Sequence, residues 1–70
     1  MKIVLTEHAA ARVRKRCVLK EEVLDAIQRP DRTRKQEGKY FYEKRLDRGT
    51  IEVVCERTET HIKVLTIYWV

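Results

Sequence analysis

The stretch KYFYEKRLDRGTIEVVCERTETHIKVLTIYWV, residues 39–70, decides the fold because it reads as three strand-like runs joined by two short turns. In the middle run, Ile51, Val53 and Cys55 alternate with Glu52 and Glu56, as expected for a half-buried strand. The last run, residues 61–70, is apolar on both faces and is therefore expected at the centre of a sheet. The stretch predicts an antiparallel meander.

Upstream of the meander, residues 31–36 form a fourth strand-like run, and Pro30 separates this run from two helical segments. Residues 7–16 carry a narrow apolar stripe, and a second helix ends near Arg29. Because the last strand needs a second neighbour, we expect the β-branched run at residues 2–5 to pair with it. The predicted fold is α+β, in the order β-α-α-β-β-β-β, with two helices packed on one face of a mostly antiparallel twisted sheet.

Length and composition limit the function classes. With 70 residues we expect a single domain, residues 1–70, with a thin core and no deep substrate cavity. Cys17 and Cys55 are too few for a disulfide framework, and both are expected on core faces as inert thiols. No apolar run resembles a signal peptide or a membrane span, so we expect a cytoplasmic protein that does not associate with membranes. The spacing of His and Cys residues predicts no metal, and the two glycines predict no phosphate loop and no cofactor.

The charge pattern points to an anionic partner. The chain has 16 Lys plus Arg against 11 Asp plus Glu, and the cations concentrate in residues 1–16 and 29–48. Cations beside aromatic rings suit single-stranded RNA, whose bases stack on such planes. The alternative is a solvated surface whose tyrosines pack against the helices. The predicted nucleic-acid-binding residues are Arg14, Lys15, Arg32, Arg34, Lys35, Lys39, Tyr40, Tyr42, Lys44 and Arg45.

The first helix carries a more specific pattern. His8, Arg12 and Arg16 follow i, i+4, i+8 spacing and therefore share one helix face. Arg binds a phosphate bidentately and stabilises the charge that develops during phosphoryl transfer, while His transfers a proton near neutral pH. In the structural alternative, His8 caps or packs at the helix start while the two arginines pair with Glu22 or Asp25.

The same positions carry a family resemblance that spans the chain from Leu5 to Trp69. The pattern resembles a family of small prokaryotic domains of unknown function that is grouped with the RelE-type toxins; its motifs here are His8-x-x-x-Arg12-x-x-x-Arg16, Glu21-Glu22-Val23, Pro30-Asp31 and Thr66-Ile67-Tyr68-Trp69. The chain departs from the family pattern at Cys17-Val18-Leu19, where the family tends to have Gly then Ile and a Ser or Thr helix cap.

The resemblance implies a RelE-like fold and, by analogy, a metal-independent endoribonuclease that acts on free RNA or at the ribosome and is neutralised by an acidic antitoxin. The catalytic candidates are His8, Arg12 and Arg16 with Tyr68 from the closing motif. Two alternatives stay open because fold does not determine function: a non-catalytic nucleic-acid-binding module and a protein-interaction module.

Overall fold

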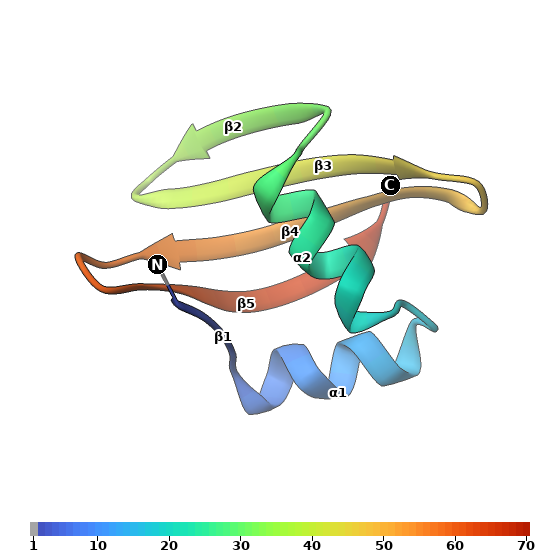
Figure 1. Cartoon of the computed structure of the whole chain (residues 1–70), viewed down its shortest axis with the longest axis horizontal. Helices are drawn as coiled ribbons and strands as arrows, with labels where there is room; N and C mark the ends of the chain where they lie inside the picture. Colours follow the sequence, from blue (N-terminus) through green and yellow to red (C-terminus); the bar gives the residue numbers. More distant parts are fainter. Residues whose placement is uncertain (1) are drawn as a thin grey trace.

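The protein, described by a computed structural model of residues 2–70, combines a five-stranded sheet with two helices (Figure 1). The α+β order predicted from the sequence is confirmed, and the predicted ranges 2–5, 7–16, 31–36 and 61–70 each end within one residue of the observed elements. No helix within this range has the length and apolar character needed to cross a membrane. The elements are β1 (Lys2–Leu5), α1 (Glu7–Lys15), α2 (Lys20–Gln28), β2 (Arg32–Gln36), β3 (Lys39–Leu46), β4 (Gly49–Arg57) and β5 (His61–Trp69).

The strands are arranged in the order β1-β5-β4-β3-β2. β5 lies between β1, which it pairs with in parallel, and β4, which it pairs with in antiparallel fashion. Ile3 pairs with Ile62 and Leu5 with Val64, so the expected pairing of the first run with the last is confirmed. The meander of β2, β3, β4 and β5 makes the rest of the sheet antiparallel.

One sheet face and the two helices enclose the core. In Figure 1, α2 lies across β3 and β4 while α1 runs along β5, and helix residues such as Ala9 and Val23 are fully buried there. From the strands, Ile51, Val53 and Ile67 are also fully buried on this face. Burial of these apolar side chains is the main stabilising term for so small a domain.

The opposite sheet face carries neither helix, and we call it the open face. Strand pairing and the alternation of side chains assign residues to it, because cross-strand partners point to the same side. Its residues are Arg32, Arg34 and Gln36 of β2; Lys39, Phe41, Glu43 and Arg45 of β3; Thr50, Glu52, Val54 and Glu56 of β4; and Lys63, Thr66 and Tyr68 of β5.

The two helices begin with different capping groups. The hydroxyl of Thr6 accepts a hydrogen bond from the Ala9 amide at 3.0 Å, as the sequence predicts for a cap of α1. Leu19 precedes α2 and has no side-chain acceptor, and the Glu22 carboxylate instead accepts from the Leu19 amide at 2.9 Å. The Glu22 carboxylate also accepts hydrogen bonds from both terminal nitrogens of Arg48, and these bonds hold the pKa of the Glu22 carboxyl below its ordinary value.

The two cysteines differ in environment. Cys55 is fully buried, and burial raises the pKa of its thiol to about 12, as an inert core thiol requires. The expected core position of Cys17 is wrong, because this residue is exposed in the turn after α1. Its φ of 56° lies in the left-handed region, which glycine adopts without a steric penalty, and the family resemblance expects Gly at this place.

Candidate functional site

A buried carboxylate lies at the centre of the open face. Glu52 is only 6% exposed although no helix covers it. The Tyr68 hydroxyl, on the neighbouring strand, donates a hydrogen bond to Glu52 Oε1, and Nη2 of Arg34 lies 3.5 Å from the same oxygen. A buried charge is costly unless it is paired and hydrogen-bonded, and these two partners supply both interactions. The three side chains therefore form one cluster of a hydroxyl donor (Tyr68), a carboxylate acceptor (Glu52) and a cation (Arg34).

Arg34 is fixed in place by three contacts. Its guanidinium carbon lies 4.4 Å from the centre of the Phe41 ring, which is a cation–π distance. Its Nη1 donates to the Gln36 side chain at 3.0 Å, while Nη2 faces Glu52. The side chain of Arg34 is nevertheless 53% exposed. Arg34 and Phe41 thus form a stacked pair whose guanidinium is accessible to a ligand.

A second carboxylate breaks a rule of strand pairing. Glu43 lies directly opposite Glu52, and like charges in this position repel one another. The Glu43 side chain is half-buried, and within residues 2–70 its carboxylate makes no hydrogen bond or ion pair. Conflicts between a residue and its local surroundings are expected mainly at functional or strained positions. Glu43 is therefore a candidate for contact with a ligand.

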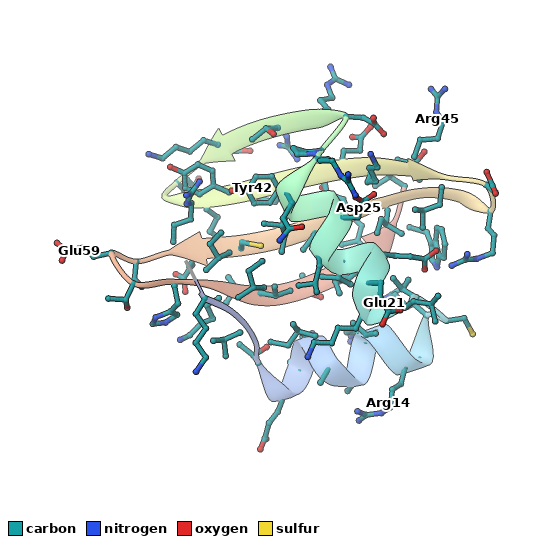
Figure 2. The ribbon with its side chains drawn as sticks, viewed as in Figure 1. Arg14, Glu21, Asp25, Tyr42, Arg45 and Glu59 are labelled. Atoms are coloured by element: carbon teal, nitrogen blue, oxygen red, sulfur yellow. The ribbon has the colours of Figure 1, made fainter. Side chains whose placement is uncertain are left out.

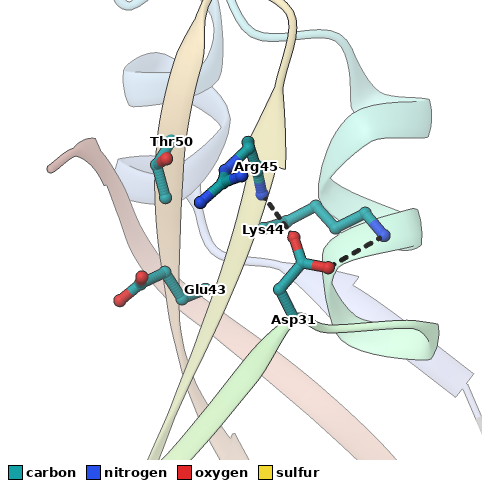
Figure 3. Close-up of a pocket in the computed structure, with 5 residues that line it drawn as sticks. All are labelled: Asp31, Glu43, Lys44, Arg45 and Thr50. Atoms are coloured by element: carbon teal, nitrogen blue, oxygen red, sulfur yellow. Dashed lines mark hydrogen bonds and ion pairs between the residues drawn. The ribbon is translucent and has the colours of Figure 1, made fainter.

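Two shallow hollows on this side of the sheet meet at Glu43. One, of about 250 Å³, is lined by Arg32, Arg34, Phe41, Glu43 and Glu52. The other, of about 460 Å³, is lined by Asp31, Glu43, Lys44, Arg45 and Thr50 and is drawn in Figure 3. Their size and openness suit parts of an extended polymer better than a buried cofactor.

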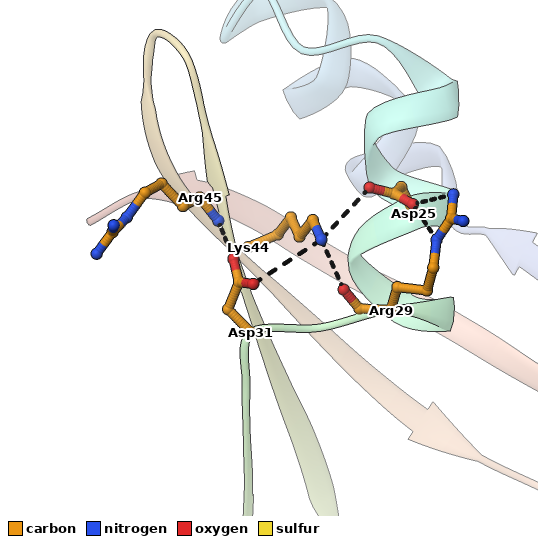
Figure 4. Close-up of polar contacts among 5 residues, drawn as sticks. All are labelled: Asp25, Arg29, Asp31, Lys44 and Arg45. Atoms are coloured by element: carbon orange, nitrogen blue, oxygen red, sulfur yellow. Dashed lines mark hydrogen bonds and ion pairs between the residues drawn. The ribbon is translucent and has the colours of Figure 1, made fainter.

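A polar network fixes the strands that carry the site (Figure 4). The ammonium of Lys44 donates to the Arg29 carbonyl at 2.8 Å and lies 3.7 Å from Asp25 and 3.9 Å from Asp31. Asp31 in turn accepts from the Arg45 amide at 2.7 Å, and the hydrogen bond from Arg29 lowers the pKa of the Asp25 carboxyl. The network joins the end of α2 and the residue before β2 to β3.

The predicted nucleic-acid-binding residues fall into three groups. Arg32, Arg34, Lys39 and Arg45 lie on the open face. Arg14 and Lys15 are exposed on α1. The helix-covered face holds Lys35, Tyr40, Tyr42 and Lys44.

Tyr42 requires a correction. It is 4% exposed, lies beside α2 in Figure 2 and stacks on Tyr40 with ring centres 6.0 Å apart. Because its ring is part of the core, no base can stack on it, and the alternative interpretation of packing against the helices holds for this residue. Tyr40 and Tyr42 lie on the same face of β3, and Phe41 between them lies on the opposite face.

The helix triplet is only partly assembled. Nε of Arg12 donates to Nε2 of His8 at 3.3 Å, which requires this nitrogen of His8 to be unprotonated. The backbone carbonyl of Arg16 accepts a hydrogen bond from the Trp69 indole at 3.0 Å. The side-chain Nε of Arg16 is buried and makes no hydrogen bond within the described chain. The structural alternative also differs from what is found, since Glu22 pairs with Arg48 and Asp25 with Arg29 and Lys44.

Tyr68 does not join that triplet. Its hydroxyl contacts Glu52 on the open face, and no hydrogen bond or ion pair within residues 2–70 links it to His8, Arg12 or Arg16. Glu52, Glu43 and Phe41 are functional candidates that sequence reasoning missed, because their grouping with Tyr68 depends on the register of four strands.

The titration of Tyr68 offers a first test of the cluster. The hydrogen bond to Glu52, together with burial, raises the pKa of the Tyr68 hydroxyl above its ordinary value of 10.0. A raised pKa contributes stability that is present below the ordinary value and is lost as pH rises through the folded-state pKa. We therefore expect the extra stability of wild type over Tyr68→Phe to be constant between pH 7 and 9 and to decrease as the pH rises above 10. Urea unfolding from about pH 7 to about pH 12, with Tyr40→Phe as the control, measures this difference; a difference that does not depend on pH over the whole range would contradict the contact.

Comparisons with known proteins give one match. A family model described as "Domain of unknown function (DUF4258)" matches residues 5–69. No curated protein and no solved structure matches the chain. The match spans almost all of the fold described above, including both helices and the whole open face.

Proposed function

Because the chain belongs to the DUF4258 family, whose description assigns no activity, we infer its function from the open face and propose a RelE-like, toxin-type domain that binds and cleaves single-stranded RNA. The observation that carries the proposal is the cluster of Arg34, Glu52 and Tyr68 on an uncovered sheet face. A ribosome or an acidic antitoxin as a further partner stays a prediction from the resemblance to the RelE-type toxins.

The open face has the two properties that single-stranded RNA binding needs. Arg32, Lys39 and Arg45 lie around the hollows and supply positive charge for phosphates. The guanidinium of Arg34, held over Phe41, supplies a plane on which a base stacks. These contacts do not depend on Tyr42.

The cluster also supplies the groups for cleavage without a metal. In the proposed step, the ribose 2′-oxygen attacks the adjacent phosphorus and the bond to the 5′-oxygen breaks, which leaves a 2′,3′-cyclic phosphate and a 5′-hydroxyl. Glu52 accepts the 2′-hydroxyl proton, and the Tyr68 hydroxyl, which is protonated at neutral pH, donates a proton to the leaving oxygen. The proton on Glu52 then returns to Tyr68 through the hydrogen bond between them. Arg34 stabilises the negative charge that develops on the phosphate.

A non-catalytic RNA-binding module is the second candidate. One observation favours it: the Glu52 carboxylate already accepts a hydrogen bond from Tyr68 and faces Arg34, so its hydrogen bonding and its charge are satisfied without a substrate. Structural ion-pair networks have the same appearance as catalytic ones. The two candidates share the binding surface and differ only in whether RNA is cut.

Binding is tested by the salt dependence of RNA affinity. Arg32→Ala with Arg34→Ala removes two cations from the open face, so we expect weaker binding and a plot of log affinity against log salt that is shallower by about 1.4, at about 0.7 per phosphate contact. Fluorescence anisotropy with a labelled single-stranded RNA measures both quantities.

The matched control is Arg14→Ala with Lys15→Ala, which removes the same charge from the exposed side of α1. The control pair should change the slope by much less than the open-face pair. Equal losses from both pairs would show that binding follows net charge, and a loss from the control pair alone would move the interface to α1.

A further inference from the structure

The unpartnered carboxylate of Glu43 needs an explanation within the proposed RNA site. It is half-buried where the two hollows meet, and Arg32 lines one of these hollows while Arg45 lines the other. A phosphate at this point would be repelled by the Glu43 carboxylate, which has no cation paired with it within residues 2–70. A carboxylate accepts hydrogen bonds, so the ligand atoms that reach Glu43 must be N–H or O–H donors.

The stacking plane lies within reach of the same carboxylate. Arg34 pairs across the strands with Phe41, and Arg32 pairs with Glu43 two residues further along β3. Such diagonal neighbours on one sheet face are about 7–8 Å apart, a distance that a nucleobase spans. A base stacked on the guanidinium of Arg34 therefore directs one edge toward Glu43, while its flanking phosphates lie near Arg32 and Arg45.

The geometry points to guanine as that base, and this inference rests on the proposed function. On its Watson–Crick edge guanine presents two neighbouring donors, N1–H and the N2 amino group, which match the two oxygens of one carboxylate as an Arg fork does. Adenine and cytosine present one exocyclic amine beside an acceptor, and uracil presents a single N–H between two acceptors. Glu52 is occupied by Tyr68 and Arg34, so the free Glu43 carries this selection.

The competing account is a simple ion pair between Glu43 and its cross-strand neighbour Arg32, which would leave no carboxylate for a base. The two accounts differ in whether RNA sequence affects affinity. They also differ in what Glu43→Gln does, because an amide offers only one acceptor and cannot pair with both guanine donors.

The test uses five short single-stranded RNAs that differ only at one central position, which is guanine, inosine, adenine, cytosine or uracil. Inosine keeps the N1–H donor and lacks the N2 amino group. We expect the guanine RNA to bind about tenfold to a hundredfold more tightly than the other four, as the loss of one hydrogen bond to a charged group predicts. Glu43→Gln should abolish this preference, while Glu56→Gln, the same charge change on the same face but outside the hollows, should retain it.

Two outcomes would overturn the inference. Equal binding of all five RNAs by wild type, or a guanine preference that survives Glu43→Gln, would exclude recognition by this carboxylate while leaving the proposed function in place. Failure of all five RNAs to bind would overturn the proposed function and this inference with it.

Discussion

Tyr68→Phe and Glu52→Gln are each expected to slow RNA cleavage by about 100-fold to 10,000-fold, which is the usual contribution of a general acid or base. Tyr68→Phe removes the proton that the hydroxyl donates, and Glu52→Gln removes the group that accepts the 2′-hydroxyl proton. Both replacements preserve side-chain shape, so RNA affinity should stay within a few-fold of wild type. Single-turnover cleavage at saturating protein separates the chemical step from binding.

His8→Ala is the matched control for this prediction. His8 is exposed on α1, accepts a hydrogen bond from Arg12 and makes no hydrogen bond with Tyr68 within residues 2–70, so its loss should leave cleavage unchanged. Cleavage that is lost in His8→Ala and retained in Tyr68→Phe would assign the chemistry to the helix triplet. Binding by wild type without any cleavage would favour the second candidate, a binding module.

Ile67→Ala is expected to lower the free energy of unfolding by about 2–5 kcal/mol, as for other large-to-small changes in a core. Ile67 is fully buried in β5, which pairs with strands on both sides. A domain of this size has a total stability of roughly 4–10 kcal/mol, so the variant should be unfolded or nearly so at mild denaturant concentrations. Urea unfolding followed by circular dichroism measures the change.

The neighbouring residue provides the control for Ile67. Thr66 lies on the open face opposite Val54, so Thr66→Ala should change stability by less than about 1 kcal/mol. A loss from Thr66→Ala as large as that from Ile67→Ala would contradict the division into a core face and an open face. The division matters because the proposed site depends on it.

Most of the fold could be predicted from local sequence patterns. The change from helical to strand periodicity at Pro30 identified two helices followed by four strands. Residues 61–70 read as central because they are apolar on both faces, and β5 does lie between two strands. The pairing of residues 2–5 with β5 was predicted by elimination, because no other strand was left to pair with the second edge of β5.

The open-face cluster could not be predicted, because it depends on register. Alternation along β4 assigned Glu52 to solvent, and its burial results from Tyr68 on one neighbouring strand and Arg34 two strands away on the other side. A shift of one residue in either pairing would send these side chains to opposite faces. Turn lengths in the sequence indicate hairpins but do not fix register to that precision.

Residue types alone were also not sufficient to identify the binding residues. The run Lys39 to Arg45 alternates between faces, so only half of its cations and aromatic rings reach the open face. Tyr42 belongs to the half that packs under α2, while Phe41, which is not among the predicted binding residues, supports Arg34. The missing information was which face the helices cover, and tertiary packing decides this.

The central claim is that RNA binds on the open sheet face. Backbone amide chemical shifts, followed by NMR while a short single-stranded RNA is added, test it most directly. We predict that the largest shift changes occur around Arg34, Glu43, Glu52 and Tyr68, with little change along α1. Changes concentrated at His8, Arg12 and Arg16, with the open-face strands unaffected, would contradict the account.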